Sequence, residues 1–267
     1  MTPADIESAA ERLFAAEAKG EQIGLLSIAH PEMTIDDAYA VQSALVMRKL
    51  AAGRTRIGWK IGLTSRAMQE ALKITTPDSG VLLDDMLFED GCLIPAGRFI
   101  QPRIETEIAF SIQTDLSGAD VDAADVLAAT GWCAPALEIL DTRICRSDAK
   151  TKVLRNVCDT VSDNAANAGI VLGQERHNPA DIDRRFVGCI LNRDGIVEET
   201  GLAAGVLGDP ATSVAWLVMR LNRYGQGLKA GDIVLSGSFI RPVEALPGSQ
   251  FHADFGSFGT IACQFGS

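Results

Sequence analysis

The chain has 267 residues, of which 47% are hydrophobic, so it can bury a sizeable core either as one large domain or as a core with an extension. It carries 24 Lys and Arg against 35 Asp and Glu, which gives a formal net charge of -11. This charge disfavours binding to nucleic acid or to an anionic membrane and favours a small-molecule role. The first residues lack the basic and apolar regions of a signal peptide, and no apolar run approaches the roughly 20 residues that span a bilayer, so we expect a cytoplasmic protein.

Two capping boxes predict helices in the first fifth of the chain. The first, at residues 2–5, has Pro3 in its first turn, and hydrophobic residues then follow at helical spacing as far as Gly20. The second, at residues 34–37, opens a helix that closes near Gly53. The N-terminal part is therefore predicted to be helical.

The pattern changes at Arg56 to short apolar runs between turn residues, which are typical of strands. These runs are RIGWKIGL, GVLLDDMLF, FIQPRIETEIAFSI and PALEILDTRI, followed later by DIVLSGSFI, QFHADFG and GTIACQF. Asp209 and Pro210 open one further helix between them. Because helices and strands are segregated, we predict an α+β fold with a mixed β core, divided into an N-terminal helical extension (residues 1–55) and a β-rich catalytic core (residues 56–267).

Several kinds of chemistry lack their usual residues. The chain has three histidines without metal-ligand spacing and six scattered cysteines without a CxxC pair, which we interpret as buried free thiols. The motifs GxGxxG, GxxxxGK[ST], GxSxG and HExxH are absent, so dinucleotide, P-loop, α/β-hydrolase and zincin chemistry are not indicated. Any catalysis must use carboxylates, lysine and hydroxyl groups.

Glu105 and Glu107 are the first candidates for a metal site. On a strand they point to the same side, with Cα atoms roughly 6.5–7 Å apart, so both carboxylates can reach one cation. An edge strand with two ordinary surface glutamates would fit the same segment. Glu138 stands among the apolar residues of PALEILDTRI, where a carboxylate needs a partner. That partner is a shared hard cation, Mg²⁺ or Mn²⁺, or an arginine such as Arg143 or Arg103.

Lys60 and Asp78 are candidates for the chemistry itself. Lys60 is flanked by Gly58 and Gly62, which on an extended strand would leave room for a ligand to approach the backbone. Its ammonium could neutralise a substrate carboxylate or relay a proton, although a surface lysine fits the pattern as well. Asp78 follows a proline, and an Asx-turn would explain it on spacing alone.

Hydroxyl groups in two segments could contact a ligand. Ser162 lies in DTVSDNAANAG, where N-capping of a helix is a sufficient explanation. Ser236 and Ser238 in LSGSFIRP precede Arg241 and could bind a carboxylate together with it. A plain Gly-Ser strand end explains the second segment equally well.

These segments together resemble the hydratase and decarboxylase family of the fumarylacetoacetate-hydrolase superfamily. The resemblance covers almost the whole chain and includes the segments HPEMTIDDAYAVQ, TPDSGVLLDDM, FIQPRIETEIAF, PALEILDTRI, DTVSDNAANAG and LSGSFIRPV. It implies metal ligands at Glu105, Glu107 and Glu138, the same three residues that the strand argument selects. It further implies Lys60 and Asp78 as catalytic residues and substrate contacts at the positions Leu83 (through its backbone), Ser162 and Ser238.

The resemblance also implies an activity, namely metal-dependent addition of water to a small 2-oxo-4-enoate from aromatic-ring catabolism. The PD of the turn and the SGSFIRPV ending favour hydration over the decarboxylation of the sister enzymes. Five-carbon and seven-carbon substrates both remain open, and Arg241 or Arg103 is a candidate for binding a distal carboxylate. A homo-oligomer, associated in some cases with a neighbouring pathway enzyme, is expected by analogy. A non-catalytic chain that stabilises such an enzyme is the alternative from another class.

Overall fold

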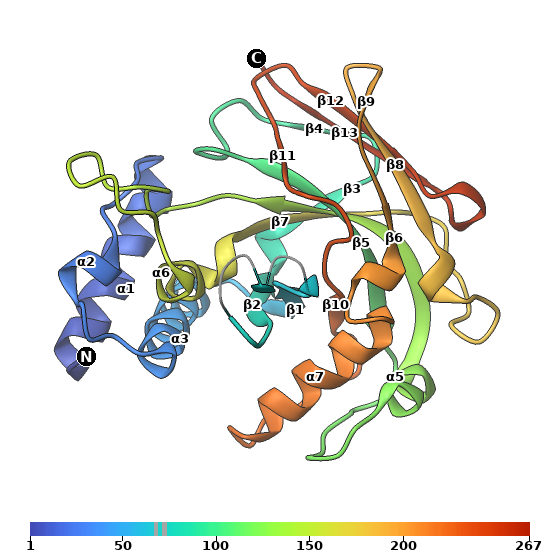
Figure 1. Ribbon diagram of the computed structural model, residues 1–267, viewed down its shortest axis with the longest axis horizontal. Helices are drawn as coiled ribbons and strands as arrows, with labels where there is room; N and C mark the ends of the chain where they lie inside the picture. The colour runs from blue at the N-terminus through green and yellow to red at the C-terminus, as the bar shows by residue number, and fades with distance from the viewer. Residues whose placement is uncertain (67–68, 71–73) are drawn as a thin grey trace.

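In the computed structural model, two β-sheets and a group of helices surround one main hydrophobic core (Figure 1). The structure describes residues 1–66, 69–70 and 74–267. The chain starts at the helical side of the molecule and ends beside the smaller sheet. In the described parts of the chain, no helix is long and apolar enough to cross a membrane.

Three helices, α1, α2 and α3, occupy the N-terminal segment, and strands follow from Arg56 onward. Both predicted capping boxes are present, because Thr2 and Thr34 each cap a helix and each receives the reciprocal bond from the carboxylate three residues later. The bounds of these helices are α1 Pro3–Lys19, α2 Leu26–Ala29 and α3 Ile35–Ala51. The predicted change from helix to strand is therefore confirmed.

Eight strands form the larger sheet, in the order β2-β1-β10-β5-β6-β7-β3, with β11 also paired to β5. Strands β5 and β6 are antiparallel, long and central, so both of their edges are covered by neighbours. The bounds are β1 Arg56–Gly62, β2 Asp78–Leu83, β3 Leu87–Glu89, β5 Arg103–Ile112, β6 Thr130–Leu140, β7 Asn167–Leu172, β10 Ile233–Leu235 and β11 Val243–Glu244.

Five strands form the smaller sheet, in the order β4-β13-β12-β8-β9. Its bounds are β4 Cys92–Ile94, β8 Gly188–Arg193, β9 Ile196–Leu202, β12 Gln250–Asp254 and β13 Thr260–Phe265. The predicted strands QFHADFG and GTIACQF are confirmed as the antiparallel pair β12 and β13. Strands β4, β8 and β9 were not predicted, since they are short or partly exposed and carry weak alternation.

The main core lies between the two sheets and helix α7 (Pro210–Asn222), whose predicted start at Asp209 is confirmed by the cap that this side chain makes. Residues Ile104, Ile108 and Phe110 of β5 turn toward this core. The opposite side of β5 carries Glu105 and Glu107, because side chains alternate along a strand. We call this opposite side of the larger sheet the carboxylate face.

Two shorter helices complete the fold, α5 (Ala123–Ala129) and α6 (Val157–Ser162). Helix α6 packs against α3, so a segment from the middle of the chain joins the N-terminal helices (Figure 1). It leads through a single turn, Asn164–Ala166, directly into β7. This connection brings the helical part of the molecule next to the carboxylate face.

Two predicted strands are wrong in extent. GVLLDDMLF divides into the end of β2, a short turn at Asp84–Met86 and β3, so it is not continuous. DIVLSGSFI is a strand only over Ile233–Leu235. After that strand Gly237 has φ +115°, a conformation that glycine tolerates, and its backbone N–H donates a hydrogen bond to Glu107 of β5.

Candidate metal and catalytic site

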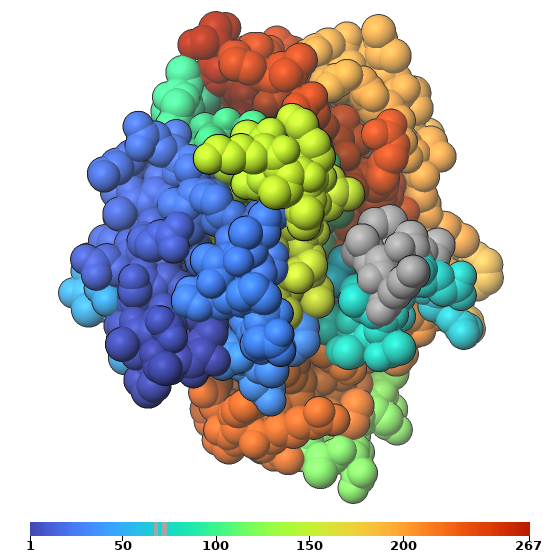
Figure 2. All heavy atoms as spheres, turned by 60° about the vertical axis from the view of Figure 1, so that its left-hand side comes forward, coloured from blue at the N-terminus to red at the C-terminus, as the bar shows by residue number. Residues whose placement is uncertain are grey.

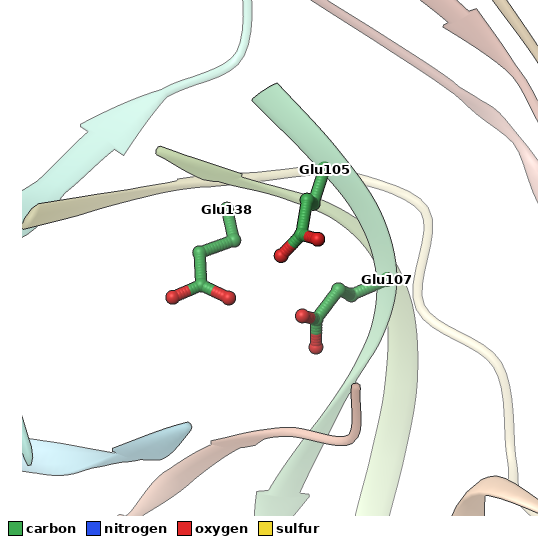
Figure 3. A group of neighbouring side chains, drawn as sticks. All are labelled: Glu105, Glu107 and Glu138. Carbon is green, nitrogen blue, oxygen red and sulfur yellow. The ribbon is translucent and has the colours of Figure 1, made fainter. Parts of the chain in front are cut away.

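Glu105, Glu107 and Glu138 lie together on the carboxylate face, and Figure 3 shows their side chains turned toward one another. One carboxylate oxygen from each lies within 4.8 Å of those of the other two. The register explains this closeness, since Glu105 stands directly opposite Glu138 across β5 and β6, and Glu107 follows two residues along the same strand.

The carboxylates are deep inside the protein. Glu107 and Glu138 are fully buried and Glu105 is half-buried. Strand β5 has neighbours on both edges, so the alternative of two surface glutamates on an edge strand is wrong. The alternative partners of Glu138 are also wrong, because Arg143 forms its ion pair with Asp163 and no ion pair of the described residues joins Arg103 to Glu138.

Several carboxylate oxygens at this site have no hydrogen-bond donor. In the described residues, neither oxygen of Glu138 accepts a hydrogen bond, and Oε1 of Glu107 also has no partner. The other oxygen, Glu107 Oε2, accepts a bond of 2.6 Å from the backbone N–H of Gly237. Buried acceptors without donors are costly, and three of them converging on one point indicate a site for a cation.

The electrostatics of the site point the same way. Burial, followed by repulsion from Glu138, raises the pKa of Glu105 to about 8, and the same two causes raise the pKa of Glu107 well above its usual range. Burial likewise raises the pKa of Glu138, against the attraction of Lys60. The positive charge of Lys60 is therefore too small for all three carboxylates to ionise together, and a further cation would be needed.

Lys60 extends from the neighbouring part of the sheet into this group. It is 2% exposed, so the surface-lysine alternative is wrong. Its ammonium nitrogen lies 3.2 Å from Glu138 Oε1 and donates a hydrogen bond of 3.1 Å to the carbonyl of Ala165. Burial alone lowers the pKa of Lys60, but Glu138, Asp78 and the other carboxylates outweigh that effect and raise it, so the side chain stays a cation.

The carbonyl that holds Lys60 comes from an unusual turn. Asn164, Ala165 and Ala166 all have positive φ, between 52° and 57°, which costs roughly 1–2 kcal/mol for each residue that is not glycine. The Asn164 side chain holds the turn in place, since its Oδ1 accepts from the N–H of Val81 (2.8 Å) and its Nδ2 donates to the carbonyl of Val81 (2.9 Å). Such strain is typical of positions that a binding or catalytic site requires.

Asp78 is the second acidic group beside Lys60. It begins β2 opposite Gly62 and is 3% exposed, so the Asx-turn interpretation is wrong. Its Oδ1 has no hydrogen-bond partner among the described residues. Burial raises the pKa of Asp78 despite the attraction of Lys60. A buried carboxyl of raised pKa is suited to hold or release a proton.

The two glycines around Lys60, Gly58 and Gly62, are required for packing within the protein. A Cβ at Gly62 would lie 2.3 Å from Oδ1 of Asp78, and one at Gly58 would lie 1.8 Å from the carbonyl oxygen of Ile233 in β10. The expectation that these glycines leave room for a ligand is therefore wrong. They let Asp78 and β10 approach β1 closely.

The remaining predicted residues lie at different places. Ser162 ends helix α6, whose N-cap is Asn156, so the capping interpretation is wrong; its hydroxyl is fully buried and has no partner among the described residues. The Ser238 hydroxyl instead donates to the carbonyl of Ile240 in a local turn. The side chain of Leu83 lies in the main core, so only its backbone could face the site.

The residues at the site fit a divalent metal ion. Ligands of Mg²⁺ lie about 2.0–2.1 Å from the ion, so two opposite ligands are separated by about 4.2 Å. The spacing of up to 4.8 Å among the three carboxylates needs only small side-chain rotations to match this. The donor set consists of oxygen atoms, which hard cations such as Mg²⁺ and Mn²⁺ prefer.

Comparisons with known proteins identify the family of the chain. No protein-family model matches the chain. Among curated proteins, 2-oxo-hept-4-ene-1,7-dioate hydratase of Escherichia coli is 51% identical over 256 residues, which are 96% of each chain. 2-Keto-4-pentenoate hydratase of Paraburkholderia xenovorans is 39% identical over 267 residues, 100% of this chain and 97% of the relative.

Solved structures give the same result for the fold. The 4-oxalocrotonate decarboxylase from Pseudomonas putida G7, complexed with magnesium and adipate, has a TM-score of 0.93 and 31% identity, covering 99% of this chain and 98% of its own. Fumarylpyruvate hydrolase from Pseudomonas aeruginosa, at 12% identity and a TM-score of 0.59 over 79% of this chain and 90% of its own, supports the fold alone.

The chain therefore belongs to the hydratase and decarboxylase family of the fumarylacetoacetate-hydrolase superfamily. This confirms the predicted fold and the predicted family. Within that family the chain is a hydratase, an enzyme of the hydro-lyase class that acts in aromatic catabolism.

Sequence reasoning missed two groups that organise the site. The N–H of Gly237 and the carbonyl of Ala165 both belong to the backbone, and their partners Glu107 and Lys60 lie 130 and 105 residues away along the chain. The positive φ of Gly237 could have been suspected from its place in LSGSF. No local sequence pattern indicates that the backbone of Ala165 adopts the left-handed conformation.

Proposed function

We propose that this chain is a divalent-metal-dependent hydratase that adds water to 2-oxo-hept-4-ene-1,7-dioate, through its 2-hydroxy-2,4-dienoate form, to give a 4-hydroxy-2-oxo acid. The observation that carries the proposal is the group of three buried carboxylates beside Lys60 and Asp78. The 51% identity to a hydratase of that seven-carbon dioate supports this substrate over the five-carbon one, whose named hydratase is 39% identical.

In this proposal Glu105, Glu107 and Glu138 hold the metal ion, Mg²⁺ or Mn²⁺. The structural neighbours support a divalent ion, since the decarboxylase structures contain magnesium or calcium and the fumarylpyruvate hydrolase contains Mn²⁺. When bound, such an ion would supply positive charge for the 1-carboxylate and for the 2-oxygen of the substrate. That oxygen carries most negative charge once the dienol has lost its hydroxyl proton and before a carbon atom of the chain gains one to give the ketone.

The protein side chains then have separate tasks. Lys60 remains an ammonium between Ala165 and Glu138, where it holds Glu138 in place and adds positive charge near the substrate's carboxylate end. Asp78, whose Oδ1 has no donor among the described residues, moves the proton that reaches or leaves the substrate carbon chain. The hydroxyl of Ser162, which is buried and has no hydrogen-bond partner among the described residues, contacts the substrate, and so does the backbone of Leu83. Ser238 is a weaker candidate, because its hydroxyl already donates a hydrogen bond to the carbonyl of Ile240.

Product analysis tests the reaction. Purified protein with Mg²⁺ and the seven-carbon dienol should consume the substrate and yield a 4-hydroxy-2-oxo acid without release of CO₂. Release of CO₂ with no hydrated product would assign the chain to the decarboxylases, whose fold it shares at a TM-score of 0.93. Absence of both products would refute the proposal and favour the alternative of a non-catalytic chain that stabilises a pathway enzyme.

We further propose that the protein acts in the cytoplasm as a homo-oligomer. The support is analogy with its family, and light scattering of the purified protein measures the number of subunits. Association with a neighbouring pathway enzyme would appear as a second, larger species when that enzyme is added.

A further inference from the structure

Three arginine side chains gather at one end of the carboxylate face, where β5 begins. Arg103 stands two residues before Glu105 on the same side of the strand, roughly 6.5–7 Å away along it. Arg146 reaches the same strand entry, since its Nη2 donates to the carbonyl of Gln101 (3.3 Å). The backbone N–H of Arg155 bonds the carbonyl of Arg146 (3.0 Å), which places both on one loop. We call these three residues the arginine group.

The arginine group has no acidic partner. In the described part of the chain, no ion pair within 4.0 Å includes any of its three members. Asp163 and Asp159 attract Arg155, and Asp141 and Glu244 attract Arg146, but Asp163 forms its ion pair with Arg143 (2.5 Å), and Asp141 accepts from the N–H groups of Ile100 and Gln101 (2.9 and 2.7 Å). The Arg155 guanidinium donates a hydrogen bond to a neutral group, the Thr142 hydroxyl (2.8 Å). In the described residues these guanidinium groups thus have no carboxylate in direct contact.

This charge is held at a cost. All three side chains are half-buried. Burial, together with repulsion from Arg103 and Arg155, lowers the pKa of Arg146 to about 10. Burial also lowers the pKa of Arg155 against the attraction of Asp163, and Arg103 acts in the same direction as burial. Like charges brought together without a counter-ion are the arrangement that an anionic ligand relieves.

The arginine group also lies within electrostatic reach of the catalytic residues. Arg155 is among the cations that oppose the burial-induced rise in the pKa of Asp78, and Arg103 does the same for Glu105. The loop of residues 143–156, which carries Arg146 and Arg155, lies on the surface in Figure 2, coloured yellow-green between the blue N-terminal helices and the red C-terminal part. A ligand anchored at the three glutamates could thus extend toward this loop.

We propose that Arg103, Arg146 and Arg155 bind the second carboxylate of the substrate and so select a dicarboxylic 2-oxo-enoate over a monocarboxylic one. The inference rests on the proposed function, because it assumes that the 2-oxo acid end of the substrate binds at the three glutamates. Guanidinium groups suit this task, since each can offer two parallel N–H donors to a carboxylate. A five-carbon monoacid would leave the arginine group without a counter-ion.

The other candidate for this role, Arg241, is less available. Its guanidinium is paired with Glu199, and its side chain is 63% exposed. An exposed, already paired arginine gains little from a further carboxylate. The arginine group has the opposite properties, because it is half-buried and unpaired in the described residues.

Binding of two matched saturated ligands tests the proposal without depending on turnover. 2-Oxoheptanedioate and 2-oxoheptanoate have the same chain length and the same 2-oxo acid end, and differ only in the distal carboxylate. Calorimetric titration of the Mg²⁺-loaded protein should show the dioate binding about 10- to 100-fold more tightly, the range that a charged hydrogen-bonded contact provides. Arg146→Gln and Arg155→Gln should each remove most of that preference, and Arg155→Lys should keep part of it.

The controls separate this inference from the proposed function. Arg48→Gln, at a surface arginine paired with Glu7, should leave the preference unchanged. Equal binding of both ligands to the unaltered protein, or an unchanged preference in both arginine variants, would overturn the inference; so would a preference lost only in Arg241→Gln. If the dioate is preferred but no water is added to the unsaturated substrate, the proposed function fails and the inference stands. Thermal melting confirms that each variant is folded.

Discussion

The ammonium of Lys60 lies 3.2 Å from Glu138 Oε1 in a fully buried ion pair, yet neither oxygen of Glu138 accepts a hydrogen bond from the described residues. Glu138 also stands directly opposite Glu105 across the strand pair. One lysine therefore balances only part of the charge of the carboxylates.

Replacement of Glu138 by glutamine should strongly weaken metal binding while the fold survives. The amide keeps the shape of the side chain but removes one of three anionic ligands, so we expect Mg²⁺ affinity and turnover to fall by about 100-fold or more. Calorimetric titration with Mg²⁺ and circular dichroism measure the two properties. Glu7→Gln, at an exposed ion pair, should change neither. Full Mg²⁺ affinity in Glu138→Gln would refute the metal assignment.

Replacement of Lys60 by methionine should produce a loss of stability that metal restores. Removing one partner of a buried ion pair costs about 3–5 kcal/mol, because the other charge is left without compensation. Urea unfolding of the metal-free variant should show this loss, and saturating Mg²⁺ should recover most of it while turnover stays low. Lys49→Met breaks the pair with Glu17 far from the metal site, so Mg²⁺ should not recover its loss. Equal losses with and without Mg²⁺ in Lys60→Met would contradict the prediction.

The stability of the metal-free protein should fall as pH rises. Burial and then Glu138 raise the pKa of Glu105 to about 8 from its ordinary value of 4.5, and the same causes raise the pKa of Glu107 well above its ordinary value. A raised pKa means that the folded state binds protons which the unfolded state has released, so the stabilisation is complete below about pH 4.5 and is lost as pH rises through about 8.

Thermal melting between pH 5 and 8, buffered at about equal ionic strength, measures this slope. Excess Mg²⁺ should flatten it, because the ion takes the place of the protons and prefers ionised ligands. Glu107→Gln should also give a shallower slope in the metal-free protein. A melting temperature that rises with pH over this window in the absence of metal would show that the carboxylates are not protonated there.

Asp78→Asn should separate catalysis from metal binding. The asparagine keeps the size of the side chain but cannot exchange a proton, so turnover should fall by about 100-fold or more while Mg²⁺ affinity remains. Asp84→Asn, at an exposed carboxylate a few residues later, should leave both unchanged. Near-normal turnover in Asp78→Asn would move the proton-transfer role to another group.

Asn164→Ala should disturb Lys60 without touching it. The substitution removes both hydrogen bonds to Val81 and leaves the strained turn unsupported, which should cost about 2–3 kcal/mol of stability. Because the carbonyl of Ala165 then shifts, turnover should fall more than Mg²⁺ affinity does. Matching losses in turnover and Mg²⁺ affinity would indicate that the turn supports the whole site and not Lys60 in particular.

Much of the site could be predicted because its main signals are local. The alternation of FIQPRIETEIAF places Glu105 and Glu107 on one side of a strand whatever the strand pairs with. The capping boxes at Thr2 and Thr34 likewise depend on only four residues each. The buried setting of Glu138 indicated that its carboxylate needs a partner, and family resemblance supplied what this left open, namely that Glu138 shares a cation with the other two glutamates and that Lys60 joins the same site.

The unpredicted parts depend on contacts between distant segments. Ser162 was interpreted as an N-cap because the sequence does not show that the helix is capped by Asn156 and ends at Ser162. The glycines beside Lys60 appeared to admit a ligand, whereas Asp78 and β10 fill that space only after β1 has paired on both sides. The arginine group is likewise assembled from β5 and a loop more than 40 residues later.

The direct opposition of Glu105 and Glu138 across β5 and β6 has a consequence for protein engineering. Like charges facing each other across two strands weaken a sheet, and Ala109, Ala136 and Leu235 already supply an apolar surround. A library screened only for heat resistance without added metal should therefore enrich uncharged residues at these two positions and yield robust but inactive enzymes. Screens for improved variants of this hydratase should keep Mg²⁺ present or score turnover directly.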